Sequence, residues 1–281
     1  MISLDGGCMD SAKQRAIREI IDSSLKSFIN GFEARYEGEI DNPNGVINSK
    51  KNNCFIAELG EEFIFYSALV RSFDSSFGNT LEAIGNSVAK LSYDVKGSIN
   101  SFLLPEQKQH IANIMNSYEA HHVLPSIEHY ANHNVIVPPD ITSFKMSHET
   151  DNYFYNPVKK EHYIIELKAG GDLDNKKSRS EKNAILEEYF LLKNALIDKP
   201  EHKVFLFFAT AYNRFGEGNP WKQSSVKQYF AEEELLIGKN YWNFVCDDEH
   251  GFDIVFEQYK ENAKNIKKAL ENIKSMYFGV V

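Results

Sequence analysis

The chain is poor in cysteine and lacks long apolar runs. Its three cysteines, Cys8, Cys54 and Cys246, are scattered and odd in number, a pattern that excludes a disulfide framework and a cysteine-based metal finger. No apolar run approaches the ~20 residues that a membrane-spanning helix needs, and the N-terminus lacks the basic and apolar regions of a signal peptide. These absences predict a cytoplasmic protein with no membrane association.

Positive charge is also scarce. The chain has 31 basic and 40 acidic residues, a net charge of −9, whereas a simple phosphate-binding module would be basic. Nucleic-acid binding nevertheless requires only a local positive surface, and two clusters could provide one. The first consists of Lys176, Lys177, Arg179 and Lys182, and the second of Lys260, Lys264, Lys267, Lys268 and Lys274. We favour the first as a nucleic-acid contact because it follows the apolar strand that carries Glu166 and Lys168, a candidate metal site, while the second is equally typical of a solvated helix face.

Two apolar stripes have the three- and four-residue spacings of amphipathic helices. The first consists of Ile17, Ile21, Leu25, Phe28 and Phe32, and the second of Leu59, Phe63, Tyr66 and Val70. Between them, residues 36–53 are polar and predict a loop. We therefore expect a helical segment and polar loop over residues 1–54 and a larger domain over residues 55–281, or one continuous domain.

Two charged residues project from an otherwise apolar strand. The segment from Tyr163 to Leu167 has the composition of a buried strand, and Glu166 and Lys168 are two residues apart at its end. Alternate residues of a strand share a face. The sequence therefore predicts that this carboxylate and this ammonium lie side by side.

A second aromatic strand precedes this one and predicts a hairpin. Residues 152–155 form that strand, and residues 156–160 carry the Asn-Pro and Lys-Lys that are typical of a turn. A hairpin folded about residues 158 and 159 pairs residues whose numbers add up to about 317, so Asp151 faces Glu166. Cβ atoms of such partners lie ~5 Å apart. Two carboxylates at this separation can share a divalent cation, and an adjacent lysine completes a set that can cut a phosphodiester.

These residues resemble the catalytic core of the PD-(D/E)XK nuclease superfamily. The resemblance covers Asp151, the strand with Glu166-Leu167-Lys168, the helix that follows and the apolar strand at residues 203–209. Within the superfamily, the segments 71–82 and 236–244 are similar to an Arg-Ser…Gly-x-x-x-Glu helix start and a Gly-Lys-x-aromatic-Trp segment of type II restriction endonucleases. The resemblance implies an α/β fold, in which a central mixed β-sheet is flanked by helices, with a helical N-terminal region and a C-terminal helix.

The resemblance also implies a magnesium site. Asp151, Glu166 and the carbonyl oxygen of Leu167 would hold Mg²⁺, with Mn²⁺ as a substitute. Lys168 would orient or deprotonate the attacking water and offset charge on the phosphorus. Glu82 lies on a helix stripe of otherwise small residues and would be a third acidic group near the metal. Alternatively, Glu82 is a surface residue of that helix.

Asp140 is an alternative to Asp151 as the first acid of the motif, the aspartate that precedes Glu166 and Lys168. Asp140 follows Pro139 and so matches the superfamily's Pro-Asp literally, whereas Thr150 precedes Asp151. In the hairpin register, however, Asp140 would pair with residue 177, beyond the end of the strand. We therefore expect Asp151 to be the first acid and keep Asp140 as the reserve.

The resemblance implies a type II restriction endonuclease that hydrolyses double-stranded DNA at a specific sequence. It also implies a homodimer, with the region from Phe230 to Phe244 among its contacts, and a cognate DNA methyltransferase as a functional partner. One alternative is another nuclease of this fold, from DNA repair or mobile elements. The other is a non-catalytic DNA-binding protein with this fold.

Overall fold

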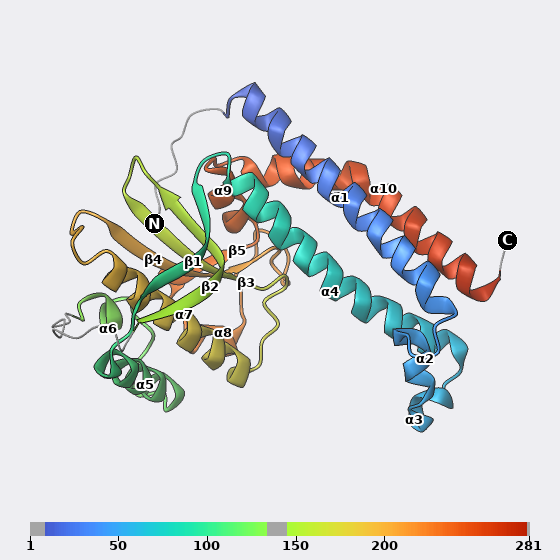
Figure 1. Cartoon of the computed structure of the whole chain (residues 1–281), viewed down its shortest axis with the longest axis horizontal. Helices are drawn as coiled ribbons and strands as arrows, with labels where there is room; N and C mark the ends of the chain where they lie inside the picture. The colour runs from blue at the N-terminus through green and yellow to red at the C-terminus, as the bar shows by residue number, and fades with distance from the viewer. Residues whose placement is uncertain (1–8, 134–144, 280–281) are drawn as a thin grey trace. The chain divides into compact units, whose positions relative to one another are not determined.

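The computed structural model describes residues 9–133 and 145–279, and only the backbone over residues 145–151 (Figure 1). The described residues form two compact units. A sheet unit contains residues 88–252, and a helical unit contains residues 9–87 together with the chain from residue 253 onward. The boundary expected between residues 54 and 55 falls inside the helical unit. None of the described helices is long and apolar enough to cross a membrane.

The helical unit is built on three long helices. Its elements are α1 (Ser11–Ile40), α2 (Val46–Lys51), α3 (Cys54–Ala57), α4 (Glu61–Ala89) and α10 (Gly251–Phe278). The expected loop at residues 36–53 is therefore largely helical. Tyr36 is buried and extends the apolar stripe of α1 by one more turn, and Ile47 anchors α2 in the same core. These two apolar side chains outweigh the polarity of their neighbours.

The sheet unit contains a mixed sheet, as the sequence predicted. In the described part of the chain its strand order is β1-β2-β3-β4-β5. Strands β1, β2 and β3 are antiparallel neighbours, and β4 and β5 continue the sheet parallel to β3. The strands are β1 (Asp94–Phe102), β2 (Lys145–Asn156), β3 (Glu161–Leu167), β4 (Lys203–Thr210) and β5 (Leu235–Ile237).

Helix α7 (Asn175–Ala195) connects β3 to β4 (Figure 1). Its buried side chains, such as Leu186 and Phe190, share a core with Ile164 of β3 and Leu206 of β4. The other α-helices described in this unit are α5 (Pro105–Glu119), α6 (Glu128–Ala131), α8 (Ser224–Lys227) and α9 (Lys239–Cys246). The face of β3 that carries Ile164 is therefore the one that α7 covers.

The β2–β3 hairpin has the register that the sequence predicted. Tyr153 pairs with Ile164 and Asn156 with Glu161, so the paired residue numbers add up to 317. The turn explains this register. The side-chain oxygen of Asn156 accepts hydrogen bonds from the backbone nitrogens of Val158 and Lys159, at 3.1 and 3.0 Å. Such an Asn turn fixes which residues face each other.

A buried histidine lies at the start of β3 and contacts a second histidine just before β4. His162 is 3% exposed, and its Nδ1 and Nε2 atoms lie 2.8 Å from Tyr153 Oη and 2.8 Å from His202 Nδ1. Burial lowers the pKa of His162 to about 4, and His202, Lys96 and Lys199 lower it further. The imidazole is therefore neutral in the folded protein at pH values where it would be charged in the unfolded chain.

We expect acid to destabilise the fold through this group. Between about pH 6.5 and pH 4 the unfolded chain binds a proton that folded His162 does not bind, so the free energy of unfolding should fall by up to ~3 kcal/mol. Urea unfolding at a series of pH values would measure this loss. His162→Gln should flatten the dependence, and His122→Gln, at an exposed histidine, should not. Equal pH profiles for wild type and His162→Gln would contradict the assignment.

Candidate active site

Glu166 and Lys168 meet at the end of β3, as the sequence predicted. The Nζ atom of Lys168 lies 2.5 Å from Glu166 Oε1, and the two side chains are 33% and 14% exposed. The backbone nitrogen of Lys168 donates to the carbonyl oxygen of Ala209 at 3.0 Å. The chain therefore remains hydrogen-bonded to β4 beyond the last residue of β3. This bond fixes the position of the Lys168 backbone, from which its side chain extends.

A third charged side chain completes this cluster. Glu181 Oε1, on α7, lies 3.3 Å from Lys168 Nζ. Sequence reasoning missed this residue, although a signal existed. Glu181 stands one turn before Ile185 and Tyr189, the buried stripe of α7, so the helical period places it toward the sheet. The charged cluster therefore combines a strand end with the helix that follows it.

The charges of the cluster are unbalanced. Burial disfavours the ammonium of Lys168, but Glu166 and Glu181 together outweigh this effect and raise its pKa. Two carboxylates thus share one ammonium and leave a net negative charge. Asp151 would increase that negative charge. Carboxylate and carbonyl oxygens with excess negative charge form a donor set that suits a hard divalent cation.

The backbone of β2 is irregular at Asp151. Lys96 of β1 pairs with Tyr153 and Ser98 pairs with Glu149, so Gly97 alone stands opposite residues 150–152. Asp151 is the middle residue of this bulge, and bulges redirect side chains beside active sites. Its side chain lies outside the described residues, as does all of Asp140.

The other proposed site residues lie in different places. The side chain of Leu167 is 8% exposed, and alternation along β3 directs it to the face opposite Glu166, so only its carbonyl oxygen is available to a metal ion. Glu82 lies on α4 in the helical unit.

The first basic cluster is divided by the structure. Lys176 and Lys177 are exposed in the first turn of α7, which Asp174 caps by accepting from the nitrogen of Lys177 at 2.8 Å. Arg179 forms an ion pair with Glu119, 3.2 Å away. Lys182, which was expected to contact DNA, is instead fully buried and paired with Glu234 at 2.5 Å. It lies on the inner side of α7 and is not part of that surface.

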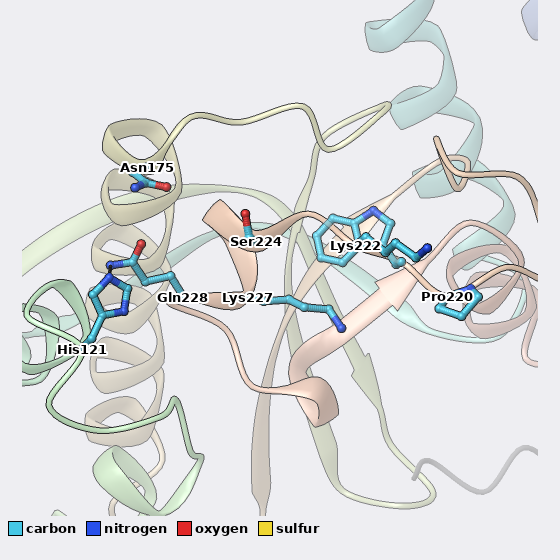
Figure 2. Close-up of a pocket in the computed structure, with 8 residues that line it drawn as sticks. His121, Asn175, Pro220, Lys222, Ser224, Lys227 and Gln228 are labelled. Carbon is cyan, nitrogen blue, oxygen red and sulfur yellow. Dashed lines mark hydrogen bonds between the residues drawn. The ribbon is translucent and has the colours of Figure 1, made fainter.

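A pocket of about 660 Å³ lies beside the first turn of α7. Figure 2 shows Asn175 on that turn, His121 and Gln228 next to each other, and Lys222 and Pro220 at the other end. The described residues that line the pocket include neither Glu166 nor Lys168. The candidate residues Glu166 and Lys168 therefore lie outside this pocket, at the C-terminal end of β3.

Comparison with known families agrees with this geometry. The model of the family described as "Type II restriction endonuclease, HinfI" matches residues 13–263, which include all of residues 88–252 of the sheet unit and most of the helical unit. No curated protein and no solved structure matches the chain. The family match favours the restriction enzyme over the repair nuclease and the non-catalytic protein that the sequence left as alternatives. The chain belongs to the HinfI family of type II restriction endonucleases, the site-specific deoxyribonucleases that act on double-stranded DNA.

Proposed function

We propose that the enzyme cuts one specific DNA sequence in a Mg²⁺-dependent reaction, with Asp151, Glu166 and the Leu167 carbonyl oxygen as the metal ligands. The observation that carries this proposal is the contact of Lys168 with Glu166 at the end of β3. An acidic group and a lysine on one strand face supply both metal ligation and a positive charge. The register of the hairpin, which is observed as far as the Tyr153–Ile164 pair and extrapolates to Asp151 opposite Glu166, supports Asp151 as the first acid. Mn²⁺ has the same preference for oxygen ligands and should substitute.

Each part of the cluster has a chemical task in this proposal. A bound divalent cation lowers the pKa of a water ligand and stabilises charge on the scissile phosphate. Lys168 is held as an ammonium by its carboxylate neighbours, which favours orienting the attacking water and neutralising charge over abstracting a proton. It would donate hydrogen bonds to the oxygens on which negative charge develops.

Digestion of unmethylated phage DNA tests the proposed function. With Mg²⁺ or Mn²⁺ we expect discrete bands, and with EDTA we expect uncut DNA. Glu166→Ala protein, purified in the same way, controls for contaminating nucleases. A smear would refute sequence specificity, and bands in EDTA would refute the metal requirement.

We also propose a cognate DNA methyltransferase as the functional partner. An enzyme that cuts a short sequence would damage its own genome unless that sequence is modified. DNA from cells that carry the matching methyltransferase should therefore resist digestion that cuts unmethylated DNA of the same sequence. Equal cutting of both DNAs would contradict this partner.

Lys176 and Lys177 are the exposed lysines that we expect to contact DNA phosphates. Each lost contact should weaken binding and reduce the slope of log affinity against log salt by about one. The test uses two double variants. One replaces Lys176 and Lys177 with alanine, and the control replaces Lys267 and Lys268, a matched pair of exposed lysines on α10, with alanine. Fluorescence anisotropy in Ca²⁺ at several salt concentrations gives both slopes. A slope equal to that of wild type in the Lys176→Ala and Lys177→Ala double variant would show that the α7 lysines are only solvated.

We propose a homodimer on DNA, because one Asp-Glu-Lys centre cuts one strand per engagement and a two-fold site suits a two-fold protein. The rings of Phe230, Trp242 and Phe244 are buried, so these three rings do not contribute to the contacts expected of the region from Phe230 to Phe244. A better candidate is the exposed apolar surface on α4, with Phe63 48% and Val70 55% exposed. Sedimentation of the metal-free complex with a short cognate duplex should find two chains per duplex. One chain per duplex would refute the dimer.

A further inference from the structure

Lys168 is held between two carboxylates that belong to different elements. Glu166 Oε1 is 2.5 Å and Glu181 Oε1 is 3.3 Å from its Nζ atom. Glu181 is carried by α7, whose next turn is fixed in the core by Ile185 and Leu186, which are 2% and 0% exposed. A carboxylate on a rigidly packed helix has a defined position relative to the strand. Glu181 therefore offers Lys168 a fixed anchor.

The two carboxylates face different demands during the reaction. Under the function proposed above, Glu166 must bind the metal ion as well as contact Lys168. A divalent cation at Glu166 would repel the nearby ammonium, because like charges disfavour each other at short range. The lysine stem is long and flexible, so repulsion could move Nζ toward solvent. Of the two carboxylates described in contact with the ammonium, Glu181 is the one that the metal site does not require. It can therefore keep its contact with Lys168 when Glu166 binds the metal ion.

We propose that Glu181 is a positioning residue, which keeps the Lys168 ammonium at the scissile phosphate when Glu166 binds the metal ion. This inference rests on the proposed roles of Glu166 and Lys168. It adds a residue from α7 to a motif that is otherwise contained in β2 and β3. Glu181 acts through Lys168 and touches neither the DNA nor the metal ion.

Two other roles for Glu181 fit the structure less well. Within the described residues no group of three or more histidine, cysteine, aspartate or glutamate side chains could hold a metal ion, so Glu181 does not belong to a second, ready-made metal cage. A purely structural ion pair is the other role. The Glu181 and Lys168 side chains are 25% and 33% exposed, and ion pairs near solvent contribute little to stability. Loss of Glu181 should therefore change the reaction rate much more than the thermal stability.

Single-turnover cleavage of cognate DNA tests the role of Glu181. Glu181→Ala should slow cleavage by at least tenfold. Glu181→Gln keeps an oxygen that accepts a hydrogen bond, so it should be slowed less. DNA affinity in Ca²⁺ should change less than twofold, and the melting temperature should change by no more than about two degrees. The matched control is Glu187→Gln, on the same helix, where Glu187 accepts a hydrogen bond from Asn183 at 3.0 Å; this variant should cleave at the wild-type rate.

The same experiment separates failure of this inference from failure of the proposed function. If Lys168→Ala cleaves normally, the proposed function fails. If Lys168→Ala is inactive while Glu181→Ala and Glu181→Gln cleave at the wild-type rate, only the positioning role fails. A higher Mg²⁺ concentration for half-maximal activity in Glu181→Gln would make Glu181 a metal ligand and would also overturn the positioning role.

Discussion

Replacing Asp151, Glu166 or Lys168 with alanine should abolish DNA cleavage while the protein stays folded. In the proposed mechanism each side chain supplies a charge, either to hold the metal ion or to stabilise the phosphate, and losing such a group typically costs roughly 10²- to 10³-fold in rate. Asp151→Ala and Glu166→Ala should in addition weaken metal binding. Cleavage of cognate DNA, with melting temperature as the folding control, measures these effects. Calorimetric titration with Mn²⁺ would separate the metal ligands from the lysine.

Two further variants test the choice of acids in the same assay. Asp140→Ala should cleave normally. Normal cleavage by Asp151→Ala together with loss of cleavage in Asp140→Ala would make Asp140 the first acid. Glu82→Gln should slow cleavage by at least tenfold and change the melting temperature by no more than about two degrees. Wild-type activity in Glu82→Gln would exclude Glu82 from the site.

The contact between Glu166 and Lys168 and the register of the hairpin were predictable because local rules determine them. Side-chain alternation along β3 puts Glu166 and Lys168 on one face, and the turn at Asn156 fixes the register of the hairpin. Both effects act over a few residues. Glu181 was not found in this way, because its contact with Lys168 depends on how α7 returns over the sheet.

Helix faces were harder to assign than strand faces. Phe63, Tyr66 and Val70 have a helical spacing and were expected to face the core, yet they are 39–55% exposed. Ile64 and Phe65, on the adjacent face of α4, are buried instead. Apolar residues on both faces make the periodicity ambiguous, and only packing against other helices decides between them.

Lys182 shows the same limit for a charged residue. It was grouped with Lys176 and Lys177 because they are close in sequence. Along a helix, however, Lys182 shares a face with Leu186 and Tyr189, which are four and seven residues ahead and are buried. Proximity in sequence therefore led to the prediction that Lys182 contacts DNA. Its position in the helical period indicates instead that its side chain lies in the core.

The buried ion pair of Lys182 joins three elements of the sheet unit. Glu234 belongs to the short 3₁₀ helix η2 (Glu232–Glu234) and is 1% exposed. Its Oε1 atom lies 2.5 Å from Lys182 Nζ and accepts from the hydroxyl of Tyr130 at 2.5 Å, and its Oε2 atom accepts from the nitrogen of Ala231 at 2.7 Å. Burial disfavours the ammonium and lowers the pKa of Lys182, although Glu234 opposes this effect. Neither charge has access to water as a substitute partner.

Glu234→Gln should therefore destabilise the sheet unit by about 3–5 kcal/mol, because it leaves the Lys182 ammonium buried without a counter-charge. Lys182→Met should also be destabilising, and the double variant should recover part of the loss, because both charges are then removed together. Urea unfolding at neutral pH measures all three free energies. At low temperature, where the variants remain folded, the salt dependence of DNA binding should equal that of wild type. Full stability of Lys182→Met with a reduced salt slope would instead make Lys182 a DNA contact.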